Sequence, residues 1–130
     1  NDSRVCFSAP LAKLLEGADR GTVYVRVDYT DKSGRVYHNN YCLDKQKNMN
    51  YPKVDLQTEV RSIEGGYEVT VSTDKFARAV CLSVADNESV YSDNYFDVQP
   101  KSSVQVQVRT RLSAEAFNAS LRLTCLNNEF

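Results

Sequence analysis

The sequence predicts an all-β protein built as an antiparallel β-sandwich. Apolar and polar residues alternate with a period of two in many short segments, which is typical of strands with one buried face. Turn-forming residues separate these segments, and helix signals are confined to two short pieces. At 130 residues, the chain is long enough for one domain, or for one domain and part of another.

The first two strands are expected over residues 22–30 and 35–43. The Asp31–Gly34 segment between them is typical of a hairpin turn, with Gly34 available for a positive φ. In the first strand apolar positions alternate strictly with Tyr24, Arg26 and Asp28. The side chains expected on the inner face are Val23, Val25, Val27 and Tyr29 from the first strand, and Tyr37, Tyr41 and Leu43 from the second.

A polar stretch over residues 44–53, which ends in Tyr51-Pro52, is the expected boundary between two parts of the chain. Alternation resumes over residues 54–60, and Gly65-Gly66 predicts a hairpin turn onto residues 67–72. Three further strands follow, over residues 77–85, 104–108 and 120–126. The side chains expected to face inward from the first and last of these are Val80, Leu82, Val84, Leu121, Leu123 and Cys125.

Two short helices complete the expected secondary structure. One lies within residues 8–17, with Ser8 as its N-cap and Gly17 as its end, and the other follows a Ser113 cap. No apolar segment approaches the roughly 20 residues that a membrane-spanning helix needs. The net charge of −1 carries no electrostatic signature of nucleic-acid binding, so neither nucleic acid nor a membrane is an expected partner.

Catalytic and metal-binding motifs are sparse. His38 is the single histidine and lies within a strand, which favours an exposed or hydrogen-bonded structural role over a nucleophile–histidine relay. No CxxC pair exists, so a zinc site is not expected. The carboxylates Asp86, Glu88, Asp93 and Asp97 fit turns best, although a Ca²⁺ site and a glycosidase pair are alternatives.

The four cysteines leave two interpretations open. Because they are widely spaced, they are either free thiols or ends of long-range disulfides, and a chain of this length can fold without disulfides. Cys81 is expected to face outward and Cys125 inward, so no bond is predicted between them. The cysteines are Cys6, Cys42, Cys81 and Cys125.

One segment carries a family resemblance. "VYSDNYFDVQPKSSVQVQV", residues 90–108, resembles the C-terminal immunoglobulin-like domain of β-mannosidases in glycoside hydrolase family 2. In that family a polar corner precedes a Pro turn and an alternating strand. The family often places Gly-Glu after this proline, whereas this chain has Lys101-Ser102. The corner residues are Ser92, Asp93, Asn94, Tyr95, Phe96, Asp97 and Pro100.

The resemblance extends over most of the chain and implies its organisation. Residues 1–50 are expected to be the tail strands of a preceding β-sandwich accessory domain, and residues 51–130 the C-terminal immunoglobulin-like domain. The family's enzymes are retaining exo-glycosidases that release β-linked mannose, and they use two glutamates on a (β/α)8 barrel. Such a barrel needs about 250 residues, so this chain is expected to be non-catalytic and to hold no cofactor.

The expected partners follow from the same resemblance. They are the catalytic barrel and the neighbouring domains of a parent chain that is secreted, periplasmic or lysosomal. A carbohydrate-binding module for mannan-type glycans is the alternative to a structural module. That alternative requires two or three exposed tyrosines on one face, and the tyrosines considered for it include Tyr24, Tyr37, Tyr91 and Tyr95.

The corner itself is interpreted as structural. The side chains of Asp93 and Asn94 are expected to bind backbone groups at a sharp bend, and Asn94 tolerates the left-handed region better than most residues. Phe96 is expected to be largely buried between the sheets, while Asp97 stays outside.

Overall fold

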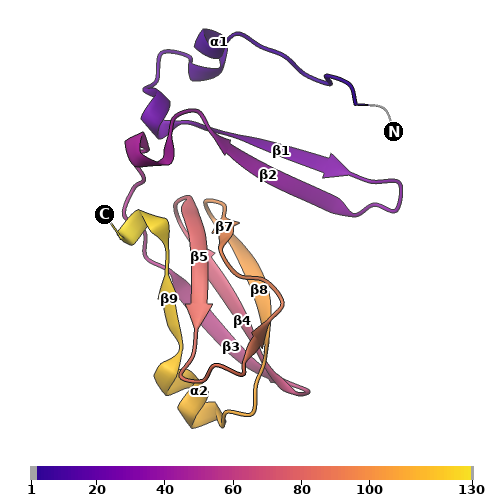
Figure 1. Cartoon of the computed structure of the whole chain (residues 1–130), viewed down its shortest axis with the longest axis vertical. Helices are drawn as coiled ribbons and strands as arrows, with labels where there is room; N and C mark the ends of the chain where they lie inside the picture. Colours follow the sequence, from indigo (N-terminus) through magenta and orange to yellow (C-terminus); the bar gives the residue numbers. More distant parts are fainter. Residues whose placement is uncertain (1–2, 130) are drawn as a thin grey trace. The chain divides into compact units, whose positions relative to one another are not determined.

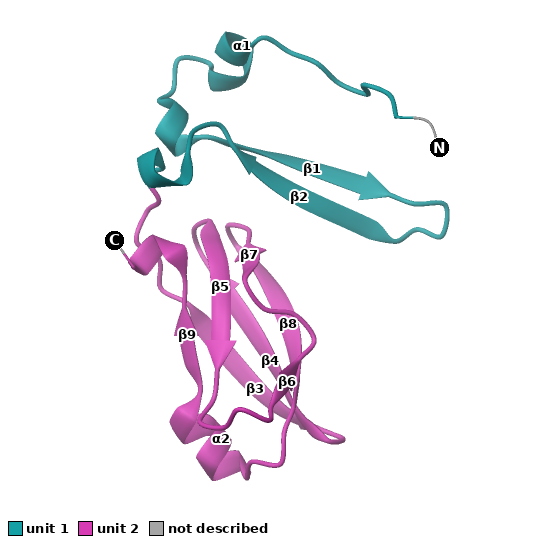
Figure 2. Ribbon diagram, in the orientation of Figure 1, with its two compact units in different colours: residues 1–50 teal, residues 51–130 magenta. Residues whose placement is uncertain are grey.

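A computed structural model describes residues 3–129 and divides the chain into two compact units, residues 1–50 and 51–130 (Figures 1 and 2). In unit 1, a short helix and a 3-10 turn precede a two-stranded antiparallel ribbon, and a second 3-10 turn follows it. These elements are α1 (Leu11–Leu15), η1 (Arg20–Thr22), β1 (Tyr24–Thr30), β2 (Val36–Cys42) and η2 (Gln46–Asn48).

The predicted hairpin turn between β1 and β2 is confirmed. Gly34 has a φ of +84°, and the Asp31 carboxylate accepts hydrogen bonds from the backbone N–H groups of Ser33 and Arg35, at 2.8 and 3.0 Å. The Ser33 hydroxyl donates to the same oxygen at 2.6 Å. These bonds lower the pKa of Asp31, the Ser33 hydroxyl first among them.

The prediction of a buried inner face in unit 1 is wrong for this chain. Val27, Tyr29 and Tyr41 are 59%, 62% and 70% exposed, and of the predicted set only Leu43 is buried. Alternation identifies the strands, but burial needs a second layer facing them. The described residues of unit 1 contain one sheet, and it has two strands.

The first helix begins later than predicted. Its N-cap is Pro10 rather than Ser8, and the helix starts at Leu11. A proline disfavours the α conformation in the residue before it, which opposes a helix that begins at Ala9. It ends as expected, because Glu16 and Gly17 both have positive φ values.

Unit 2 is an antiparallel β-sandwich (Figure 2). One sheet has the strand order β3-β4-β8-β6, and the other has the order β7-β5-β9. The strands are β3 (Gln57–Ile63), β4 (Gly66–Thr73), β5 (Ala77–Ser83), β6 (Val90–Tyr91), β7 (Phe96–Val98), β8 (Ser102–Arg109) and β9 (Arg122–Thr124), and the helical elements are α2 (Ala114–Ser120) and η3 (Leu126–Asn128).

Alternating side chains of the two sheets form the core of unit 2. The β3–β4 hairpin turn lies at Gly65, whose φ is +78°. Gly66 is required for another reason, because a Cβ atom there would lie 2.0 Å from the Val108 carbonyl oxygen. The fully buried side chains include Val69, Val71, Val80, Leu82, Val98, Val106 and Val108.

Helix α2 closes one end of the core. Its predicted cap is confirmed, since the Ser113 hydroxyl accepts a hydrogen bond from the Ala116 N–H. Phe117 is fully buried and stacks on Tyr67, with ring centroids 4.2 Å apart. No helix among residues 3–129 is long and apolar enough to cross a membrane.

Candidate functional site

The corner runs from β6 to β7 and so joins the two sheets. Its first residue, Ser92, extends the β3-β4-β8-β6 sheet. The Ser92 N–H donates to the Gln107 carbonyl at 2.8 Å. In return, the Gln107 N–H donates to the Ser92 hydroxyl at 2.9 Å. Ser92 therefore continues the β6–β8 pairing by one residue, partly through its side chain.

The side chain of Asn94 binds the backbone of β5, in the β7-β5-β9 sheet. The Leu82 N–H donates to Asn94 Oδ1 at 2.8 Å, and Asn94 Nδ2 donates to the Leu82 carbonyl at 2.9 Å. One side-chain amide thus supplies both the acceptor and the donor that a neighbouring strand residue would supply. Leu82 pairs with Leu123 of β9, so the amide completes the pairing of a central strand where β7 does not reach.

The bend falls at Tyr95 rather than at Asn94. Tyr95 has a φ of +60° and is 72% exposed. The residue with the strained backbone is thus an aromatic one, whereas the sequence favoured Asn94 for the left-handed region. Phe96 follows opposite Val80 of β5 and packs against the core, but it is only partly buried, contrary to the expectation of a largely buried ring.

The prediction that Asp97 stays outside is also wrong. Its side chain is 10% exposed and forms an ion pair with Arg78. The second carboxylate oxygen accepts a hydrogen bond from the Ala79 N–H at 3.0 Å. A β-bulge in β5 explains this arrangement, because the register shifts between Ala77 and Val80 and Ala79 has a φ of +51°. The bulge leaves the backbone N–H groups of Arg78 and Ala79 outside the β5–β7 backbone pairing, and the Asp97 side chain accepts the one from Ala79.

Asn127 accepts the other N–H group of the bulge, and the sequence analysis did not identify it. Its Oδ1 accepts the Arg78 N–H at 2.7 Å. Its Nδ2 donates to the carbonyls of Pro52 and Phe76, both at 2.8 Å. Three hydrogen bonds thus engage this side chain, and Asn127 is only 3% exposed. The consecutive asparagines near the end of the chain were the available signal.

The Pro100 turn is preserved without a glycine. The Ser102 N–H donates to the Gln99 carbonyl at 3.2 Å, and Lys101 has a φ of +56°. Proline at the second position and a positive φ at the third are typical of a type II turn. Lys101 therefore occupies a position that a glycine would adopt with less strain.

The remaining carboxylates do not converge on a metal site. Asp86 accepts the backbone N–H groups of Glu88 and Ser89, at 3.0 and 2.7 Å, and Asp93 accepts that of Asn94 at 2.8 Å. Glu88 is exposed. Within the part of the chain that the structure describes, no group of three or more metal-ligating side chains could hold an ion.

The predicted tyrosines are dispersed over the two units. Tyr24 and Tyr91 are half-buried, and the Tyr91 hydroxyl accepts the Val84 N–H at 3.1 Å. Burial raises the pKa of Tyr91. Tyr37 is 46% exposed and lies on the β1–β2 ribbon beside Tyr29, with ring centroids 6.2 Å apart.

Histidine and cysteine residues form no catalytic arrangement among the described residues. His38 is exposed and lies opposite Asp28 in the ribbon. The four cysteines are free thiols in the structure, with Cys125 buried and Cys81 half-buried.

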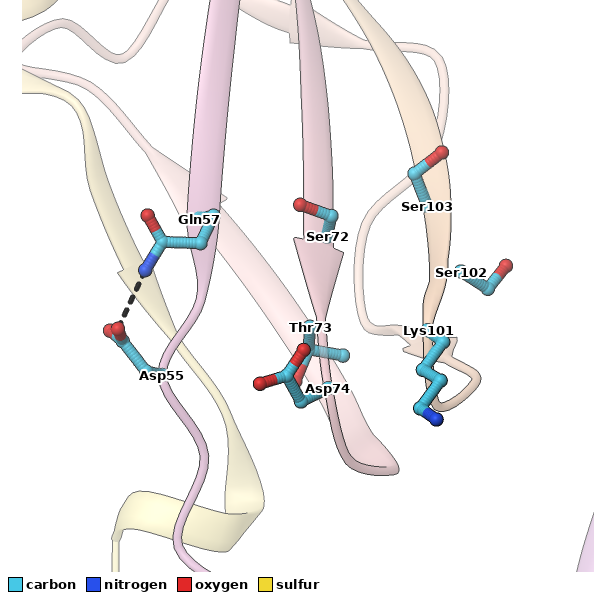
Figure 3. A pocket seen from close by; sticks show the side chains of 8 residues that line it. All are labelled: Asp55, Gln57, Ser72, Thr73, Asp74, Lys101, Ser102 and Ser103. Atoms are coloured by element: carbon cyan, nitrogen blue, oxygen red, sulfur yellow. Dashed lines mark hydrogen bonds between the residues drawn. The ribbon is translucent and has the colours of Figure 1, made fainter.

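A polar hollow of about 390 Å³ lies over the ends of β3, β4 and β8 (Figure 3). Gln57 Nε2 donates to the Asp55 carboxylate at 2.6 Å on one side of it, and Lys101 lies on the other side. No aromatic ring lines it, so it has no surface on which a sugar ring could stack. The lining residues are Asp55, Gln57, Ser72, Thr73, Asp74, Lys101, Ser102 and Ser103.

Comparison with known proteins is consistent with this geometry. A search of curated proteins finds no match. The family model Ig_mannosidase, described as an Ig-fold domain, matches residues 50–129. This range covers more than half of the chain and includes the whole sandwich of unit 2. The chain therefore belongs to the family of immunoglobulin-fold domains of mannosidases.

Proposed function

We propose that residues 51–130 form a non-catalytic structural module of a β-mannosidase-like glycoside hydrolase. The observation that carries this proposal is the direction of the corner's polar side chains. Asn94 and Asp97 each bind two groups of β5, and the Ser92 side chain binds β8. Groups engaged with their own domain's backbone are not presented to a ligand.

The activity of the parent enzyme is part of the same proposal. The resemblance of residues 90–108 supports a retaining β-mannosidase that releases β-linked mannose. The catalytic glutamates would lie on a barrel of about 250 residues, which a chain of this length does not contain. The proposed compartment, which is secreted, periplasmic or lysosomal, rests on the resemblance as well.

The proposed partners are the catalytic barrel and the other domains of the parent chain. We assign residues 1–50 to the tail strands of a preceding β-sandwich. The exposed row of Val27, Tyr29 and Tyr41 supports this assignment, because these side chains occupy the alternate positions that face a second sheet in a sandwich. A two-stranded ribbon alone has marginal stability, which also favours additional strands.

A titration with manno-oligosaccharides tests the proposal. The chain labelled with ¹⁵N is titrated to millimolar concentrations with β-1,4-mannobiose and longer oligomers, and malto-oligosaccharides of equal length serve as the control. We expect the amide resonances of Asn94 to Asp97 to remain unshifted. Saturable shifts of these amides with mannosides alone would overturn the structural assignment.

One observation favours carbohydrate binding as a second candidate function. Three tyrosines lie on one face of the β1–β2 ribbon, since Tyr29 is opposite Tyr37 and Tyr41 follows four positions along β2. Exposed tyrosine rings can stack on the apolar faces of sugar rings. Two of these rings are inclined by 32°, so they do not form a flat platform. In the same titration, shifts confined to this face and abolished by Tyr41→Ala would establish the second candidate.

A further inference from the structure

The last turn of the chain binds the segment that begins unit 2. Asn127 donates to the carbonyls of Pro52 and Phe76, and it accepts the N–H of Arg78. A single buried amide thus joins the first residues of the unit to the start of β5. Because all of its contacts are backbone groups, they depend on chain geometry rather than on the identity of neighbouring side chains.

Asn128 repeats at the start of the unit what Asn94 does at the corner. The Val54 N–H donates to Asn128 Oδ1 at 3.2 Å, and Asn128 Nδ2 donates to the Val54 carbonyl at 3.0 Å. Val54 precedes β3, the first strand of unit 2, which begins at Gln57. The side chain of Asn128 therefore supplies a strand-like partner to a residue that lies outside any strand.

The opposite side of the unit boundary is bound to unit 1. The Asn50 N–H donates to the Gly21 carbonyl at 2.7 Å. Between this bond and the Pro52 carbonyl lies a joint of three residues, 50–52. Proline fixes its own φ and restricts the residue before it to extended conformations, so Pro52 also limits Tyr51.

We infer that Asn127 and Asn128 form a C-terminal clasp that keeps the joint between the two units short. With the clasp in place, the chain is bound to unit 2 from Pro52 onward. Without it, Pro52 and Val54 would lose these side-chain partners, and the joint would lengthen toward Leu56, which packs against the core. The residues at the end of the chain would then control the mobility of a segment more than 70 positions earlier in the sequence.

Asn128→Ala is the variant that tests the clasp. Its side chain is exposed, so the substitution removes two hydrogen bonds without opening the core. Asn118→Ala, at an exposed position in α2, is the matched control. We expect amide hydrogen exchange at Val54 to accelerate about tenfold in Asn128→Ala and to be unchanged in Asn118→Ala. Amides of β4 and β8 should exchange at the same rate in Asn128→Ala as in the unsubstituted chain.

A second readout addresses the joint itself. Rotational correlation times of the two units are measured by ¹⁵N relaxation in the whole chain. Asn128→Ala leaves the bond from Asn127 to the Pro52 carbonyl in place, so the joint is tested with Asn127→Ala. We expect the two values to differ more in Asn127→Ala than in the unsubstituted chain and in Asn118→Ala, with the protection of the β4 and β8 amides showing that unit 2 stays folded. Unchanged exchange at Val54 in Asn128→Ala, or unchanged correlation times in a folded Asn127→Ala, would overturn the inference.

Discussion

The β1–β2 ribbon of unit 1 and the contact between the corner and strand β5 in unit 2 contain the same kinds of side chain in different surroundings. Each has an Asp–Arg pair, but Arg26 and Asp28 have side chains that are 32% and 48% exposed. In the corner, the Asp97 side chain is only 10% exposed and also binds the backbone of the bulge. The difference arises from the surroundings, because the corner packs against the core of a two-sheet sandwich, whereas the described residues of unit 1 contain the two-stranded ribbon as their only sheet.

Burial determines how strongly such groups contribute to stability. Exposed ion pairs contribute little, because water screens the charges and solvates either partner alone. When one partner of a mostly buried pair is removed, the charge of the other partner is left uncompensated. For the Arg78–Asp97 pair, loss of Asp97 also leaves the Ala79 N–H without its acceptor. The comparison between the ribbon and the corner can therefore be tested with matched substitutions in the two units.

Asp97→Ala should have the largest effect. We expect it to lower the free energy of unfolding of unit 2 by about 2–4 kcal/mol, because Arg78 and the Ala79 N–H both lose their partner. Asp28→Ala in the ribbon should cost less than about 1 kcal/mol. Chemical denaturation monitored by residue-resolved NMR separates the two units. Equal costs for the two substitutions would contradict the comparison.

Phe96→Ala should have a smaller effect than a fully buried aromatic ring would have. Complete burial would predict a loss of about 3–5 kcal/mol. Since Phe96 is only partly buried, we expect about 2 kcal/mol, measured by denaturant unfolding. Tyr41→Ala in the ribbon is the control, because Tyr41 is 70% exposed. Its free energy of unfolding should lie within about 0.5 kcal/mol of that of the unsubstituted chain. A loss above 4 kcal/mol for Phe96→Ala would show that the ring is buried in solution.

Lys101→Gly should stabilise unit 2. A lysine with a positive φ is strained, whereas glycine adopts this conformation freely. We expect a gain of about 0.5–1 kcal/mol, seen as a higher melting temperature. The reciprocal change Gly34→Ala places a side chain at a positive φ in the ribbon turn and should disfavour that turn. A lower melting temperature for Lys101→Gly would show that the lysine side chain itself stabilises the turn.

The smallest expected effect concerns pH and the ribbon turn. The hydrogen bonds from Ser33 and Arg35 lower the pKa of Asp31. The ionised form is therefore favoured in the folded turn, so its contribution is present above the unfolded-state pKa of about 3.9. It is lost as the pH falls through the lower folded-state pKa. NMR titration of the Asp31 carboxyl should show this lowered pKa, and Ser33→Ala should raise it; an unchanged value in Ser33→Ala would exclude the hydroxyl as its main cause.

Local patterns were sufficient to predict most strands of unit 2. The alternation in β8, the Gly65 turn and the Ser113 cap each depend on neighbouring residues, and the structure confirms them. The exposed face of the ribbon could not be predicted in this way. Alternation reports which face would be buried, but it does not report whether a covering sheet is present.

The polar contacts of the corner were harder to predict because they connect distant positions. Asn127 binds Arg78 and Pro52, which precede it by 49 and 75 residues. The inward position of Asp97 depends on the bulge at Ala79, and no glycine marks that bulge in the sequence. Only the three-dimensional register of β5 and β7 brings these groups together.

Hydrogen exchange at the Leu82 amide tests most directly whether the corner is structural. Its acceptor is the Asn94 side chain rather than a strand backbone. We expect this amide to be protected from exchange in the unsubstituted chain and to exchange at least tenfold faster in Asn94→Ala. The control Asn39→Ala, in the ribbon, should leave its exchange rate unchanged. Unchanged protection of Leu82 in Asn94→Ala would show that the corner does not hold β5, and its polar residues would then need another role.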